Sequence, residues 1–132
     1  MIQNYFNSYI QDLKATLDEI DYAAFEQVVH ILLKAHQQDK QVFIIGNGGS
    51  ASTASHFACD LAKGTVDFDK VGFRRFRAIS LTDNMAFITA VGNDIHYDDI
   101  FSEQLKNYLN AGDVVIGISA SGNSPNVVNA LR

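Results

Sequence analysis

The stretch VFIIGNGGSASTASHFACD, residues 42–60, determines which fold we expect for the whole chain. Its first four residues form an uninterrupted apolar run, which is typical of a strand buried on both faces of a sheet. Three glycines within four positions then allow a tight turn, and the segment from Ser50 to Ala62 predicts a helix. A buried strand that leads through a glycine-rich turn into a helix predicts a parallel α/β fold.

The rest of the chain repeats this alternation. Apolar runs predict a second strand from Phe76 to Leu81 and a third from Val114 to Ile118. A helix that begins at Asp83 or Asn84 follows the second strand, and Pro125 has the fixed φ that suits the first position of another helix. Strands that alternate with helices predict a parallel sheet with right-handed crossovers.

Two helices are expected before the first strand. The first carries one broad apolar stripe with three- and four-residue spacing, and Asp21 can cap the second. The stripe comprises Ile2, Tyr5, Phe6, Tyr9, Ile10, Leu13, Leu17 and Ile20. Because one small domain cannot cover a stripe of this length, we expect a homo-oligomer, either a dimer or a tetramer.

We expect one domain over residues 1–132, with a helical segment at 1–40 and an α/β core at 41–132. Three strands are few for a parallel sheet, and the helix that opens at Pro125 has no polar stop before Arg132. The expectation is therefore that the chain ends before the C-terminal part of the domain.

Composition excludes several classes of function. With 132 residues, 47% of them hydrophobic and 19% charged, the chain is expected to be an ordinary globular domain. A formal charge of −5 argues against direct binding to nucleic acid or to an anionic membrane. A single cysteine, no recognisable signal peptide and no apolar run near the roughly 20 residues of a membrane span lead us to expect a cytoplasmic protein.

Two polar loops are expected at the same edge of the sheet. They are 46–50 after the first strand and 119–124 after the third, and each opens a helix. Ligands of open parallel sheets bind beyond the carboxyl ends of the strands, and helix N-termini attract anions. Neither loop contains Lys or Arg, so we expect a phosphate monoester on a hydroxyl-rich body. Simple helix caps and tight turns are the alternative.

Other phosphate motifs fit less well. A P-loop requires a lysine that this turn lacks. The pattern Gly46-x-Gly48-x-x-Ala51 satisfies the loose dinucleotide fingerprint. That fingerprint also requires an acidic residue about 20 positions later, at the end of the second strand. Asp67 and Asp69 have this spacing but lie in an expected loop, so a dinucleotide site remains a weaker alternative.

Charged residues suggest two further features. His56 and Asp60 are four residues apart, so they share a helix face. The pair could form a surface hydrogen bond or supply two ligands to a divalent metal, although catalytic zinc usually has three protein ligands. The expected loop 67–77 is either solvated or a basic rim that steers an anionic substrate. Its cations are Lys70, Arg74, Arg75 and Arg77.

A resemblance to a known family rests on four stretches of the chain. They are Gly46-Asn47-Gly48-Gly49-Ser50, His56-Phe57-Ala58, Gly92-Asn93-Asp94 and Gly117-Ile118-Ser119-Ala120-Ser121-Gly122-Asn123-Ser124. In order and spacing, along essentially the whole chain, they resemble the sugar isomerase (SIS) domain family and most closely its phosphoheptose isomerase branch. The resemblance implies a three-layer αβα domain.

The resemblance also implies an activity and a set of site residues. The activity is isomerisation of sedoheptulose 7-phosphate to D-glycero-manno-heptose 7-phosphate, with Asp60 and His56 in the catalytic site. Zinc bound by His56 and Asp60 is a further implication. The implied substrate-binding residues are Asn47, Gly48, Gly49, Ser50, Asn93, Asp94, Ser119, Ala120, Ser121 and Ser124. Ser119, Ser121 and Ser124 would hold the phosphate, while Asn47, Gly48, Gly49, Asn93 and Asp94 would line the sugar.

The chain departs from the family pattern at three points. Asp60 stands where the isomerases have a catalytic glutamate, and Ala120 replaces a threonine. The family's later acid/base histidine and a nearby glutamine would lie beyond Arg132. A non-catalytic SIS protein that binds sugar phosphates, such as a regulator that associates with a replication initiator, is therefore the alternative function.

Overall fold

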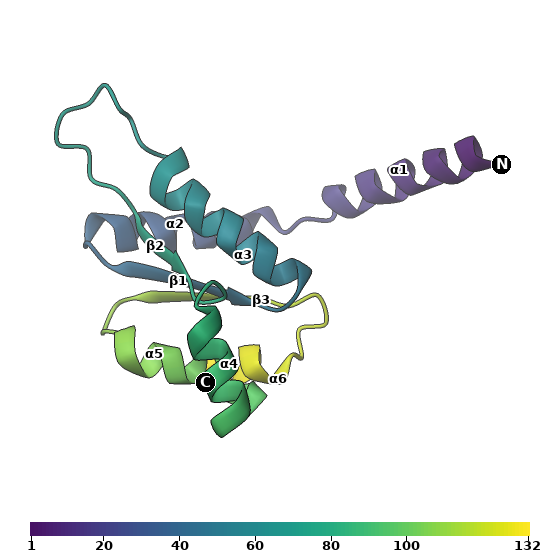
Figure 1. Ribbon diagram of the computed structural model, residues 1–132. Helices are drawn as coiled ribbons and strands as arrows, with labels where there is room; N and C mark the ends of the chain where they lie inside the picture. Colours follow the sequence, from purple (N-terminus) through teal and green to yellow (C-terminus); the bar gives the residue numbers. More distant parts are fainter. The chain divides into compact units, whose positions relative to one another are not determined.

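The structure is a computed structural model that describes residues 1–132 (Figure 1). In chain order the elements are α1 (Ile2–Asp18), α2 (Tyr22–Gln37), β1 (Gln41–Gly46), α3 (Gly49–Cys59), a π-helical turn (Asp60–Gly64), β2 (Arg77–Ser80), α4 (Met85–Asp94), a 3₁₀ turn (Tyr97–Asp99), α5 (Ser102–Tyr108), β3 (Val114–Ile118) and α6 (Pro125–Ala130). The chain divides into two compact units, Met1–Ile31 and Leu32–Arg132. The prediction of a single domain over 1–132 stays a prediction.

The second unit is built on a three-stranded parallel sheet in the order β2-β1-β3. Val42 of β1 lies opposite Ala78 on one side and Val114 on the other. The four residues from Val42 to Ile45 are at most 1% exposed, as the sequence predicted for a strand covered on both faces. Because all three strands are parallel, their carboxyl ends meet at one edge of the sheet.

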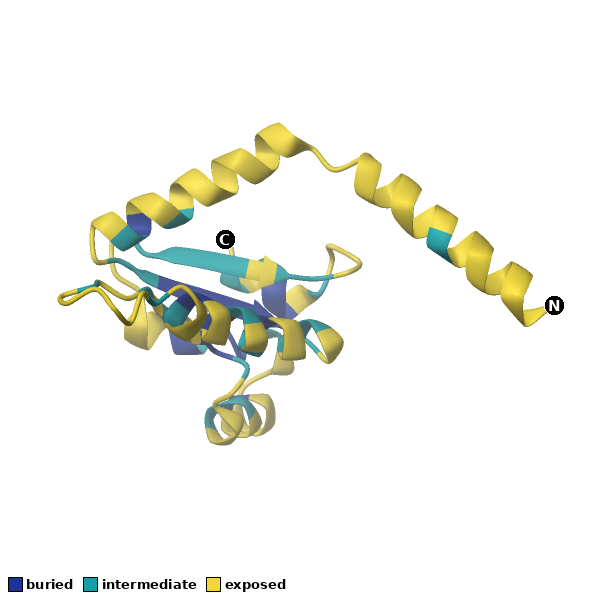
Figure 2. Cartoon of the chain, turned by 90° about the horizontal axis from the view of Figure 1, so that it is seen from above, coloured by how far each residue is buried: buried dark blue, intermediate teal, exposed yellow.

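Helices cover both faces of this sheet, which confirms the predicted αβα layers. Figure 1 shows α3 on one side and α4, α5 and α6 on the other. The central strand β1 is buried along almost its whole length, whereas β3 has no fully buried residue (Figure 2). The core on the α3 side contains Ala35, Val42, Ile44, Ala54, Ala58 and Leu61. The core on the opposite side contains Phe43, Ile45, Leu81, Val91, Ile100, Phe101, Leu105 and Val127.

The structure corrects the sequence analysis at two places between the strands. The helix predicted from Ser50 to Ala62 is α3 only as far as Cys59 and then widens into the π-helical turn. The 3₁₀ turn and α5 were not predicted at all. They form because Ile100, Phe101 and Leu105 reach the core, although the surrounding polar residues obscure a helical period.

Two of the four cations predicted for the basic loop 67–77 are used within the fold, and one of them, Arg77, is the first residue of β2. Nη1 of Arg74 donates a hydrogen bond to the Gln37 carbonyl at 2.7 Å, and Nη1 of Arg77 donates to the Asp39 carbonyl at 2.9 Å. Carbonyls at a helix C-terminus attract cations. Two of the four predicted rim residues therefore hold the end of α2, while Arg75 lies 5.8 Å from the centre of the Phe68 ring.

The first unit consists of α1 and the beginning of α2. Oδ1 of Asp21 accepts hydrogen bonds from the backbone N–H groups of Ala23 and Ala24, both at 3.0 Å, which confirms the predicted N-cap. None of the residues of α1 is buried. No helix of the structure combines the length and the apolar character that crossing a membrane requires.

Candidate functional site

The two polar loops meet at the carboxyl edge of the sheet, around a cavity of about 240 Å³ that we call the serine cavity. The loop after β1 contributes Asn47 and the first turn of α3 contributes Ser50. The remaining lining residues come from the end of β3 and the loop that follows it: Ile118, Ser119, Ala120, Ser121 and Ser124. All of the lining residues are neutral, so any anion bound here would be held by hydrogen bonds and dipoles without an ion pair.

Two glycines give the first loop its shape. A Cβ atom on Gly46 would lie 2.8 Å from the Ser50 carbonyl oxygen and 2.9 Å from its Cβ. Glycine is thus required where α3 approaches the end of β1. Gly48 has φ of 55°, a left-handed conformation that glycine adopts without strain. Gly48 and Gly49 form the start of α3 beside the cavity but do not line it.

Three serine hydroxyls converge in the second loop. Oγ of Ser119 lies 3.0 Å from Oγ of Ser124 and 3.4 Å from Oγ of Ser121. Ser124 is the N-cap residue of α6, yet its side chain makes no capping hydrogen bond to the helix. Hydroxyl groups can each donate one hydrogen bond, so this cluster has the chemistry to bind the oxygens of a phosphate group.

The side-chain amide of Asn47 is paired with a residue that the sequence analysis missed. Nδ2 of Asn47 donates to Oδ1 of Asn126 at 2.8 Å, and Nδ2 of Asn126 donates to Oδ1 of Asn47 at 2.9 Å. The Tyr97 hydroxyl also donates to Oδ1 of Asn47, at 3.4 Å. The sequence offered one signal for Asn126: it is a polar residue directly before Val127, and Val127 belongs to the core.

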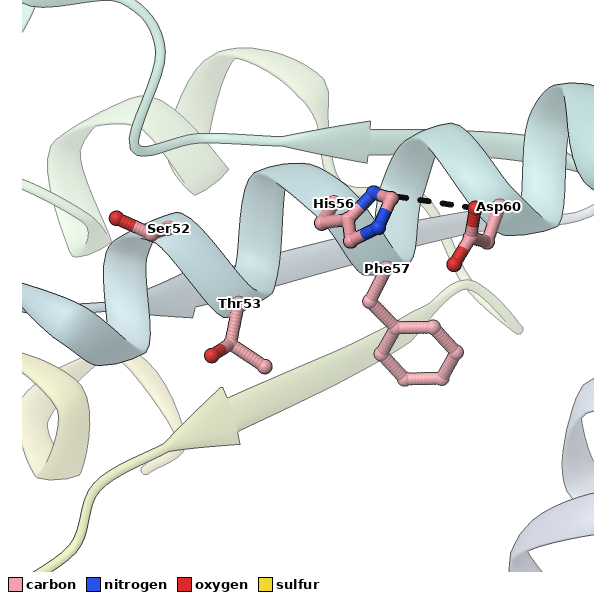
Figure 3. A pocket seen from close by; sticks show the side chains of 5 residues that line it. All are labelled: Ser52, Thr53, His56, Phe57 and Asp60. Atoms are coloured by element: carbon pink, nitrogen blue, oxygen red, sulfur yellow. Dashed lines mark ion pairs between the residues drawn. The ribbon is translucent and has the colours of Figure 1, made fainter.

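His56, near the end of α3, and Asp60, at the start of the π-helical turn, project from the same helical face (Figure 3), as their spacing predicted. Nδ1 of His56 lies 3.9 Å from Oδ1 of Asp60, and the two side chains are 79% and 64% exposed. Together with Ser52, Thr53 and Phe57 they line a separate open hollow of about 400 Å³, which we call the His56 hollow. Their proposed catalytic roles stay a prediction.

Asn93 and Asp94 lie at the C-terminal end of α4, where both are exposed. Nδ2 of Asn93 donates to Oδ1 of Asp94 at 2.7 Å. Neither residue lines the serine cavity or the His56 hollow. Their role in binding the sugar stays a prediction. Tyr97, three residues after Asp94, reaches Asn47.

The donors at His56 and Asp60 fit zinc in kind but not in number. An imidazole nitrogen and a carboxylate oxygen are both common zinc ligands. However, no group of three or more His, Cys, Asp or Glu side chains in the structure is arranged to hold a metal ion. The pair could supply two ligands, and a complete site would require a further donor.

The fold and the cavity define a class of protein. It is a three-layer αβα domain with a parallel sheet, in which glycine- and serine-rich loops border a neutral, polar cavity at the carboxyl edge. The chain belongs to the SIS domain family, whose profile matches residues 4–132.

Individual relatives support this assignment. The chain is 38% identical over 132 residues to the phosphoheptose isomerase of Helicobacter pylori (strain P12), and 43% identical over 109 residues to that of Citrifermentans bemidjiense. These alignments cover 100% and 83% of this chain, but only 66% and 55% of the two relatives. The chain thus spans between about half and two thirds of their length.

Solved structures are similar over the same region. The phosphoheptose isomerase GmhA from Neisseria gonorrhoeae superimposes with a TM-score of 0.84 at 32% identity, covering 99% of this chain and 67% of that one. A phosphoheptose isomerase from Francisella tularensis gives 0.83 at 32% identity, covering 98% and 65%.

Proposed function

We propose that the chain binds a sugar phosphate and belongs to a phosphoheptose isomerase that acts on sedoheptulose 7-phosphate. The observation that carries the proposal is the cavity in which the hydroxyls of Ser119, Ser121 and Ser124 converge beside Asn47 without any charged residue. Such a cavity suits a phosphate ester with a polar body. The similarity to named phosphoheptose isomerases supports this choice of substrate.

The proposed reaction moves a carbonyl group between neighbouring carbons of the sugar. It requires a base that removes a proton from the carbon beside the carbonyl and an acid that returns a proton. We assign these roles to the Asp60 carboxylate and the His56 imidazole. His56 projects from α3, the helix that begins at the serine cavity, and Asp60 projects from the π-helical turn that continues it. At a rise of about 1.5 Å per residue, Ser50 at the serine cavity and Asp60 are about 15 Å apart along the helix axis. The proposed base therefore lies about three helical turns from the proposed phosphate site.

We propose three associated properties. As the alternative to their acid and base roles, His56 and Asp60 with a further donor would hold zinc, which when bound would polarise the substrate carbonyl. The protein forms a homo-oligomer, a dimer or a tetramer, through the apolar stripe of α1. It works in the cytoplasm, where its single cysteine, Cys59, stays reduced.

Hydrogen exchange at the substrate carbons tests the proposed activity. The protein is incubated with sedoheptulose 7-phosphate in deuterated water, and deuterium entry at C1 and C2 is followed by NMR. We expect exchange with the wild type and a loss of about 100- to 10,000-fold in Asp60→Asn, which keeps the shape and removes the base. Asp67→Asn, a change to a loop carboxylate, is the control.

Each outcome distinguishes one part of the proposal. Wild-type exchange with an equally active Asp60→Asn variant would remove Asp60 from the chemistry. Binding of the substrate by calorimetry without any exchange would favour a non-catalytic SIS protein. Two observations favour this second function: the His56–Asp60 pair is exposed, and an aspartate stands in place of a glutamate. The same experiment tests both functions.

A further inference from the structure

We infer that Asn126 is a positioning residue for the sugar-phosphate site and acts through Asn47. The inference rests on the proposed function, because it assigns Asn126 to the binding of the same ligand. Asn126 does not line the cavity. It pairs with Asn47, which does, and so connects the loop after β1 with the helix after β3.

The pair is reciprocal and joins distant parts of the sequence. Each amide donates one hydrogen bond to the other, at 2.8 and 2.9 Å, across 79 residues of sequence. Asn126 is 1% exposed, whereas Asn47 is partly exposed at the cavity. One partner is therefore held inside the protein and the other is presented to the ligand.

The pairing also fixes which way the Asn47 amide faces. A flip of Asn47 would place donor against donor and acceptor against acceptor within the pair. The Tyr97 hydroxyl adds a second donor to Oδ1 of Asn47, which an amide nitrogen could not accept. Only one of the two hydrogens on Nδ2 of Asn47 is used in the pair, so the other can be donated to a bound sugar.

Removing the Asn126 side chain should therefore weaken binding of the ligand. Without its partner the Asn47 side chain can rotate or turn its polar atoms toward water, and it must be reordered when the ligand binds. The serine cluster does not include Asn126. We thus expect the sugar part of the ligand to lose affinity while binding of the phosphate group alone is preserved.

A double-mutant cycle tests this inference. Affinities for sedoheptulose 7-phosphate and for inorganic phosphate are measured by NMR titration for Asn47→Ala, Asn126→Ala and the double variant. We expect each single change to weaken sugar-phosphate binding about tenfold and the double change to weaken it no further. Binding of inorganic phosphate should stay within about twofold. Asn129→Ala is the control, since Asn129 is an exposed asparagine on the same helix that bonds to the Asp98 carbonyl.

A measurement without ligand separates this inference from the proposed function. The side-chain amide signals of Asn47 should shift and exchange faster with water in Asn126→Ala but not in Asn129→Ala. If Asn126→Ala fails to fold, the isosteric Asn126→Asp replaces it, because this variant still removes the donor to Oδ1 of Asn47.

Three results would overturn the inference: unchanged Asn47 amide signals, unchanged sugar-phosphate affinity in a folded Asn126 variant, or losses that multiply in the double variant. Perturbed amide signals in a protein whose wild type binds no sugar phosphate would instead overturn the proposed function, and the ligand role of Asn126 with it.

Discussion

At the scale of single residues, neutral groups dominate the candidate site. The lining of the serine cavity includes four hydroxyl side chains and one amide but no charged residue. Each contact to the oxygen of a bound phosphate would then be a hydrogen bond to a charged group, which typically contributes about 1.5–3 kcal/mol. Single hydroxyls should therefore have measurable effects on affinity without large effects on folding.

Ser121→Ala is the first prediction at this scale. Ser121 is exposed, and Oγ accepts only a hydrogen bond from the Asn123 N–H besides its contact with Ser119. We expect sedoheptulose 7-phosphate to bind about ten- to hundredfold more weakly, measured by calorimetry. The melting temperature should change little. Ser102→Ala, on α5, is the control. Unchanged affinity in the folded variant would remove Ser121 from the site.

Asp60→Glu is the second prediction at the residue scale. Asp60 is one methylene shorter than the glutamate that the family resemblance places there, and a displacement of about 1 Å can cost about 100-fold in rate. If Asp60 is the base, the longer side chain should accelerate deuterium exchange into the substrate. A Glu variant that is slower than the wild type would show that the site is built around the shorter carboxylate.

At the scale of elements, the start of α3 depends on its close approach to β1. Ala at Gly46 would bring a methyl group into the Ser50 backbone, and overpacking of this kind typically costs about 1–3 kcal/mol. We therefore expect Gly46→Ala to lower the urea midpoint of unfolding. Gly49→Ala is the matched control for stability, since its Cβ would meet nothing within 4 Å. Equal midpoints for the two variants would contradict the close approach.

The basic loop provides a second test at this scale. Arg74 bonds to the carbonyls at the end of α2, so Arg74→Ala should lower the free energy of unfolding by about 0.5–1.5 kcal/mol. Arg75→Ala loses only its contact with the Phe68 ring and should cost less. If the loop steers the substrate instead, both variants would slow ligand association in stopped-flow measurements, more strongly at low salt.

At the scale of the whole molecule, the apolar stripe of α1 has no partner within its own unit. Ile2, Tyr5 and Phe6 are 86%, 76% and 60% exposed, and no residue of the helix is buried. Clustered exposed apolar side chains of this kind mark interaction surfaces. Closed symmetric assemblies are the commonest solution for a soluble chain.

We therefore expect light scattering to give two or four times the 14.5 kDa chain mass. Leu13→Glu, in the stripe, should shift the protein toward the monomer because it places a charge in the contact. Gln11→Glu adds the same charge on the opposite side of α1 and should leave the assembly intact. A monomeric mass for the wild type at micromolar concentration would contradict the proposed oligomer.

Short-range sequence patterns predicted the local elements and the edge of the sheet at which the two polar loops meet. Patterns within a few residues predicted strands β1 and β3, the Asp21 cap and the i,i+4 placement of His56 and Asp60. Such patterns depend only on local sequence. Parallel strands also imply that their following loops share one edge. The meeting of the two polar loops was predictable for this reason.

The side chains that meet across the fold could be identified only once the strands and helices were packed together. The pairing of Asn47 with Asn126, the contact of Tyr97 with Asn47 and the use of Arg74 at the end of α2 all join residues far apart in the sequence. Such contacts depend on strand register and on how the helices pack against the sheet. The short-range periodicity of a single sequence contains no information about either.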